Sequence, residues 1–198
     1  MAFESLGRAA EEANQRGRDR LIAVYIGILA VTLAICSVGG GNAAKDATLK
    51  TIAATNTWSF FQAKNMRRHV LRMQVDELEI LKSIQPDLPE TAHAAIDTRI
   101  ASYKEQDKAL TSDPTSGEGL DELYARGKSL EAGRDIALRR DPYFDYAQAL
   151  LQIAIVLASV AIISGGTTLL GVSGLLGAAG IVLMLNGFTL AVTIPHLG

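Results

Sequence analysis

The residue types that most often carry chemistry are scattered in this sequence. The three histidines, His69, His93 and His196, lie in separate segments, and none has a second histidine or a cysteine at the spacing of metal ligands. The single cysteine, Cys36, lies in an apolar run and is expected to be a small buried residue. We therefore predict no catalytic residue, no cofactor and no metal site, and we expect the protein not to be an enzyme.

Two local clusters resemble sites only superficially. Asp76, Glu77 and Glu79 are close in sequence, but successive helix positions scatter around the axis, which favours a solvated helix face. The triplet Gly39–Gly41 lacks the Lys-Ser/Thr of a phosphate loop and follows an apolar helix rather than a strand. We predict that these glycines end that helix.

Polar side chains also occur inside apolar runs. Asp145, Gln148 and Gln152 share one helix face, and Gln152 lies near the middle of its run. Amides in lipid usually bond across helices, although such a face also suits a polar conduit. An antiparallel hairpin would place Asn186 at the depth of Gln148, so we expect these two residues to be in contact.

Small residues mark a packing groove in the last apolar run. Glycine recurs there every third residue, at Gly171, Gly174, Gly177 and Gly180. Such grooves let helix backbones approach closely, so we expect packing within the hairpin or between protomers. We predict that Gly174 and Gly177 belong to an interaction surface.

The elements that hold these residues follow from segregated composition. The chain has 198 residues, of which 20% are charged, yet its mean hydropathy is +0.19. Its net charge of −2 gives no reason to expect a nucleic-acid partner. Uncharged or nearly uncharged runs predict transmembrane helices at 21–38, 142–163 and 169–193, after a polar segment at 1–20. A cleaved signal peptide is the alternative for the first run, but the acidic residues before it favour a span.

The region 39–141 is expected to be an extramembrane helical domain. Apolar residues at steps of three and four predict one long amphipathic helix over 42–84, broken by Pro86. Two further helices are expected at about 90–110 and 118–140, and Asp141-Pro142 should start the next span. The returning helices match the outgoing one in length when placed end to end, which favours an extended hairpin over a compact three-helix bundle.

An aromatic string lies in the long helix. Trp58, Phe61 and Asn65 fall on one face at steps of three and four. Helix–helix packing is one interpretation, and a docking surface for a protein or for lipid headgroups is the other. We include these three residues and Gln152 in the candidate interaction surface.

The stretches WSFFQAKNMRRH (58–69) and FDYAQALLQIAIVLAS (144–159), together with GGNAAK after the first apolar run, resemble the domain-of-unknown-function family DUF4337. The resemblance covers about residues 21–190. It implies a bacterial membrane protein with three spans, and it supplies no activity, substrate or catalytic residue.

The sequence therefore predicts an all-α integral membrane protein with three transmembrane helices and a long helical hairpin between the first and second. We expect a structural or interaction protein of the bacterial inner membrane that contacts lipid and forms a homo-oligomer or binds a membrane-protein partner. A subunit of a transport or channel assembly is the alternative. Arginines at positions 8, 16, 18 and 20 favour a cytoplasmic N-terminus, because the first span usually dominates orientation.

Overall fold

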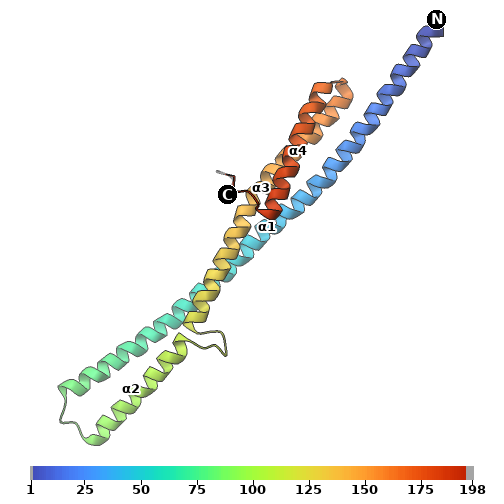
Figure 1. The fold of residues 1–198 in the computed structure, drawn as a ribbon. Coiled ribbons are helices and arrows are strands. Elements are labelled where there is room, and N and C mark those ends of the chain that lie inside the picture. The colour runs from blue at the N-terminus through green and yellow to red at the C-terminus, as the bar shows by residue number, and fades with distance from the viewer. Residues whose placement is uncertain (1, 195–198) are drawn as a thin grey trace. The chain divides into compact units, whose positions relative to one another are not determined.

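The computed structural model describes residues 2–194, with side chains for residues 14–194, so His196 and the side chain of Arg8 lie outside the description. Helices are the only regular secondary structure among the described residues, which confirms the predicted all-α class. Its four helices are α1 (Ala2–Ile84), α2 (Glu90–Thr111), α3 (Leu120–Ser164) and α4 (Thr167–Thr189) (Figure 1).

The helices form two compact units. Unit 1 contains the chain up to Ala47 and from Asp135 onward, and unit 2 contains Thr48–Arg134. Both α1 and α3 contribute residues to each unit. By length and composition, α1, α3 and α4 are each apolar enough to cross a membrane.

The predicted helix end at Gly39–Gly41 is wrong, because α1 continues through all three glycines. Packing in unit 1 explains why glycine is needed at Gly39 and Gly40, whereas Gly41 has open space beside it. A Cβ atom at Gly39 would lie 2.6 Å from Cε1 of Phe144 and 2.8 Å from Cζ of Phe188. The missing side chains make room for aromatic rings rather than ending the helix, and this packing offsets the low helix propensity of glycine.

The predicted helix start at Asp141-Pro142 is also wrong, since Pro142 lies inside α3. A proline in a helix interior removes one hydrogen bond and costs about 3 kcal/mol. The residues that follow it are deeply buried: Tyr143 and Ala147 are 0% exposed and Phe144 is 2% exposed. Their burial offsets the cost of the proline, so the third predicted soluble helix and the second predicted span form one helix.

Unit 1 has a core built by three helices. α1 supplies Leu29 and Cys36, α3 supplies Phe144, Ala147, Leu151 and Ala154, and α4 supplies Met184. The outward faces of the same helices are apolar as well, and Leu21 and Ile163 are 73% and 88% exposed. α3 and α4 are joined by a tight turn at Gly165, whose φ of 68° suits glycine.

Unit 2 pairs α1 with two successive partners. α2 lies antiparallel beside the C-terminal part of α1 (Figure 1), joined to it by ion pairs. The beginning of α3 contacts an earlier stretch of α1, where Gly127 lies against the indole of Trp58 and Gly133 against the side chain of Lys50. Helices α2 and α3 therefore follow one another along α1 within this unit.

Candidate interaction site

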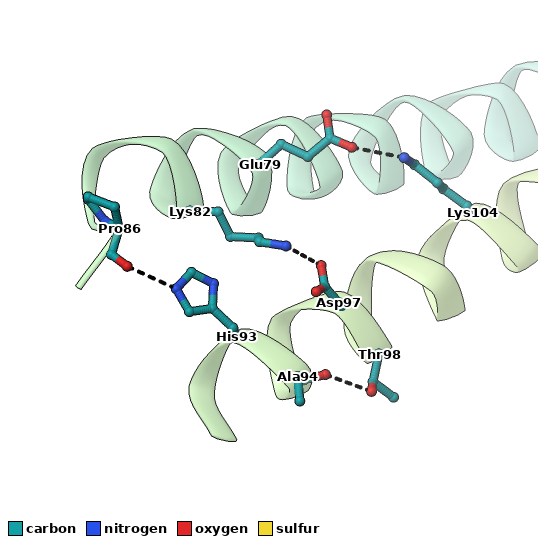
Figure 2. A network of polar contacts seen from close by, with 8 residues as sticks. All are labelled: Glu79, Lys82, Pro86, His93, Ala94, Asp97, Thr98 and Lys104. Carbon is teal, nitrogen blue, oxygen red and sulfur yellow. Dashed lines mark hydrogen bonds and ion pairs between the residues drawn. The ribbon is translucent and has the colours of Figure 1, made fainter. Parts of the chain in front are cut away.

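Ion pairs set the register between α1 and α2. Lys104 Nζ lies 2.8 Å from Glu79 Oε1, and Lys82 pairs with Asp97 one turn further along (Figure 2). Arg72 donates from Nε and Nη2 to the two carboxylate oxygens of Asp107 at 2.9 and 3.1 Å. Exposed pairs contribute little stability individually, so their main effect is on alignment.

The first turn of α2 is tied to the connection that precedes it. His93 Nε2 lies 3.4 Å from the carbonyl oxygen of Pro86 (Figure 2). The side chain of Asp97, one turn along, faces Lys82 of α1 in the same view. These charged groups already have protein partners, and no group of three or more potential metal ligands occurs among the described residues.

The predicted aromatic string takes part in packing inside unit 2. Trp58 meets Phe61 and Tyr124 edge to face, with ring centroids 5.6 Å apart in both pairs. The indole Nε1 of Trp58 donates a 2.9 Å hydrogen bond to Oε1 of Glu131. Lys128 lies over the indole at 5.7 Å and donates to the other oxygen of Glu131 at 3.0 Å.

This polar surround affects the acidity of Glu131. The hydrogen bond from Lys128 lowers the pKa of Glu131, and the hydrogen bond from Trp58 acts in the same direction. Sequence reasoning missed Tyr124, Lys128 and Glu131 as partners of the tryptophan. Their spacing of three and four residues places them on one face of α3. That spacing does not show which residues of α1 this face meets.

Asn65, the third member of the predicted aromatic face, lies apart from this cluster. Its side chain is exposed, and its Oδ1 accepts a 2.9 Å hydrogen bond from Arg68 Nη2. The structure therefore brings Trp58 and Phe61 together and leaves Asn65 at the surface of α1.

The loop between α2 and α3 is ordered by its own polar groups. The backbone amides of Thr115 and Ser116 donate to Oδ1 of Asp113, each at 3.2 Å. Glu122 accepts from Ser112 Oγ at 2.8 Å, and this hydrogen bond lowers its pKa. Lys64 of α1 donates to the carbonyl of Glu118, which fastens the loop to the long helix.

The predicted glycine groove divides into two faces. A Cβ atom at Gly177 would lie 2.9 Å from the hydroxyl of Tyr25 and 3.1 Å from Leu29, and one at Gly180 would lie 2.9 Å from Leu151. Gly171 and Gly174 have nothing within 4 Å of that position. Gly177 is therefore used inside unit 1, whereas Gly174 faces outward.

A buried polar contact beside these glycines was not predicted. Ser173 is 0% exposed, and its hydroxyl donates a 2.6 Å hydrogen bond to the carbonyl of Ala154. Tyr25 donates to the carbonyl of Ser173 at 3.0 Å, so α1, α3 and α4 are joined at this level. A serine within a glycine-rich run carried a weak signal for such a bond.

The polar residues of the predicted conduit do not form one cluster. The expected contact between Asn186 and Gln148 is replaced by local capping. Asn186 Nδ2 donates to the carbonyl of Val192 at 2.8 Å, and its Oδ1 accepts from the Val192 amide at 2.9 Å. Asp145 and Gln152 are exposed on α3, and Gln148 is half-buried.

The comparisons with known proteins agree with the resemblance seen in the sequence. No curated protein and no solved structure matches the chain. The family model described as "Domain of unknown function (DUF4337)" matches residues 18–190, which include most of all four helices. The chain therefore belongs to the DUF4337 family.

Proposed function

We propose that this protein is a structural or interaction protein of the bacterial inner membrane, without enzymatic activity, that presents unit 2 outside the bilayer to a protein partner. α1, α3 and α4 would each cross the membrane once. The arginines before the first span favour a cytoplasmic N-terminus, which would place unit 2 on the opposite side.

The outward surface of unit 1 supports the membrane assignment. Val24, Val31 and Val38 of α1 are each more than 60% exposed, and so are Leu175 and Val182 of α4. Soluble proteins rarely expose so continuous an apolar surface, whereas lipid tails would cover it without a free-energy cost.

The interaction role is carried by one observation in unit 2. Met66 and Ile84 of α1 are 64% and 68% exposed, although Arg67 lies directly after Met66 and Lys82 lies two positions before Ile84. Lipid does not suit this mixed surface, while a protein partner would bury the apolar side chains and leave the charges at the rim.

A transport or channel subunit is the second candidate, because Gln152 is exposed in the middle of the apolar part of α3. An amide in that position calls for a polar neighbour from another helix or for water. In a conduit, Asp145 and Gln152 would line a hydrated gap. In a structural protein, Gln152 would bond to a neighbouring protomer or partner.

Cysteine labelling tests the topology on which the proposal depends. Gln15 and Thr115 are exposed, and the native Cys36 is 0% exposed, so the parent protein provides an unlabelled background. We expect Gln15→Cys and Thr115→Cys to react with an impermeant thiol reagent from opposite sides of sealed vesicles. Labelling of both from one side would refute the proposed arrangement, and labelling of Gln152→Cys from the water phase would favour the conduit.

A further inference from the structure

The side of α1 that faces away from α2 and α3 in unit 2 carries a row of uncovered apolar residues. We call this row the outer stripe. Its large members are 46–68% exposed and are Leu49, Ile52, Met66, Val70, Met73, Ile80 and Ile84.

The outer stripe follows a seven-residue repeat. Successive positions alternate between steps of three and four, and exposed Asn56, Ser59, Ala63 and Glu77 fill the places between the large residues. The repeat runs without interruption from Leu49 to Ile84, which is five heptads. This spacing is that of a coiled-coil seam, where two positions in every seven meet a partner helix.

The covered side of α1 has its own seam. Ala54, Thr57 and Val75 are buried there, and Phe61 and Leu71 are half-buried. These residues are offset from the outer stripe by about half a turn of the helix, on the side where α2 and α3 pack. The contacts within unit 2 therefore leave the outer stripe without a partner from this part of the chain.

We infer that the outer stripe binds the outer stripe of a second copy of this chain in a parallel, two-stranded coiled coil. This inference rests on the proposed function, in which both copies are inserted in one membrane in the same direction. Because α1 would then leave the bilayer on the same side in each copy, a two-fold axis places every position opposite its own counterpart.

The stripe is chemically suited to pairing with itself. Asn56 occupies a core position of the repeat, where an amide can donate to and accept from its own copy and so fix the register. Most of the positions that flank the stripe are uncharged, with Thr55, Phe60, Gln62 and Gln74 among them. A parallel pair therefore brings few like charges together.

The area available is sufficient for an interface. Burying the exposed parts of the large side chains in both copies would remove roughly 1,200 Å² from water, at the lower end of stable protein interfaces. Anchoring both copies in one membrane raises their effective concentration, which makes a modest interface adequate.

One core position of the repeat holds a charged residue, and its replacement distinguishes a second copy from an unrelated partner. Glu77 lies in a core position and would face Glu77 of the other copy, where two carboxylates repel. Replacing it by leucine should strengthen a parallel homodimer. An unrelated partner that offered a basic group to Glu77 would be bound less tightly by the same variant.

Disulfide trapping in native membranes tests the pairing. We expect Met73→Cys and Ile80→Cys to form covalent dimers under mild oxidation, and Ser102→Cys, an exposed position on α2, to remain monomeric as the matched control. Val70→Asp combined with Met73→Cys should reduce trapping about tenfold or more, because a buried carboxylate easily costs the 1.4 kcal/mol that a tenfold change represents. Glu77→Leu should increase trapping.

Failure of the pairing can be told apart from misfolding of a variant and from failure of the proposed topology. Fluorescence of the single tryptophan, Trp58, shows whether unit 2 is still folded in each variant. Trapping of position 73 with position 56 instead of with itself would overturn the parallel arrangement, because an antiparallel pair that aligns position 49 with position 80 places these two positions opposite each other. Absence of any trapped dimer while Gln15 and Thr115 still label from opposite sides would overturn the second-copy inference and leave the proposed topology intact.

Discussion

The indole Nε1 of Trp58 donates to Oε1 of Glu131 at 2.9 Å, across the contact between α1 and α3 in unit 2. Trp58 is the only tryptophan and Cys36 the only cysteine of the chain. Cys36 lies in the core of unit 1 and donates to the carbonyl of Phe144 at 3.4 Å. Each unit thus contains one natural reporter: the fluorescence of Trp58 for unit 2 and the thiol reactivity of Cys36 for unit 1.

Glu131→Ala should loosen the packing around Trp58. The indole N–H would lose its acceptor inside a partly buried contact, and Lys128 would lose its partner. We expect a red shift of Trp58 emission and a decrease of a few degrees in the unfolding midpoint followed by that emission. Glu105→Ala, at an exposed position on α2, is the control and should leave both unchanged. Equal behaviour of the two variants would contradict a structural role for this hydrogen bond.

Acidification should have a related effect. The pKa of Glu131 in the folded chain is lower than its ordinary value of 4.5, because Lys128 and Trp58 donate to the carboxylate. Its stabilising contribution is therefore fully present above pH 4.5 and is lost as the pH falls through the lower folded pKa. We expect a titration in Trp58 emission with a midpoint below 4.5 that disappears in Glu131→Gln. If the transition persists in that variant, it arises from a titrating group other than Glu131.

Apolar periodicity and helix-breaking residues predicted where most of the helices lie, because helix formation depends largely on local sequence. The structure confirms a helix that begins at Glu90 and a break between the helices predicted at about 90–110 and 118–140. The breakers failed at Gly39–Gly41, where Gly39 packs against Phe144 and Phe188, more than 100 positions away, and at Pro142, which lies inside α3. Local propensity cannot register a partner at such a sequence distance.

The same limit of local patterns applies to the candidate site. Helical spacing placed Trp58 and Phe61 on one face, but it could not show that Tyr124 and Glu131 would meet them. It also could not divide the glycines of α4 between an inner and an outer face. That division depends on where Tyr25 and Leu29 of α1 lie, which is a property of tertiary packing.

Two glycines of α4 should respond differently to the same substitution. In Gly177→Leu the new side chain would meet Tyr25 and Leu29, and it would disturb the hydrogen bond from Tyr25 to Ser173. We expect a cost of about 1–3 kcal/mol, as for other overpacked cores, and earlier reaction of Cys36 with a thiol dye on heating in detergent. Gly174→Leu has open space at that position and gains helix propensity, so its midpoint should not fall. A larger effect at Gly174 than at Gly177 would refute the assigned faces.

The glycines of α1 offer the sharpest comparison, since neighbouring positions should change stability in opposite directions. In Gly39→Ala the added Cβ would lie 2.6 Å from Phe144, a ring that is 2% exposed and also contacts Phe188 at a centroid distance of 4.8 Å. The ring has little room to move, so overpacking should cost about 1–3 kcal/mol.

In Gly41→Ala nothing lies within 4 Å of the new atom, and the higher helix propensity of alanine should add about 1 kcal/mol to the stability of α1. Thiol-dye melting of Cys36 measures both variants by the same reaction, and we expect a lower midpoint for the first and a higher one for the second. If α1 instead ended at these glycines, alanine would remove the helix stop at either position and both substitutions would lower the midpoint.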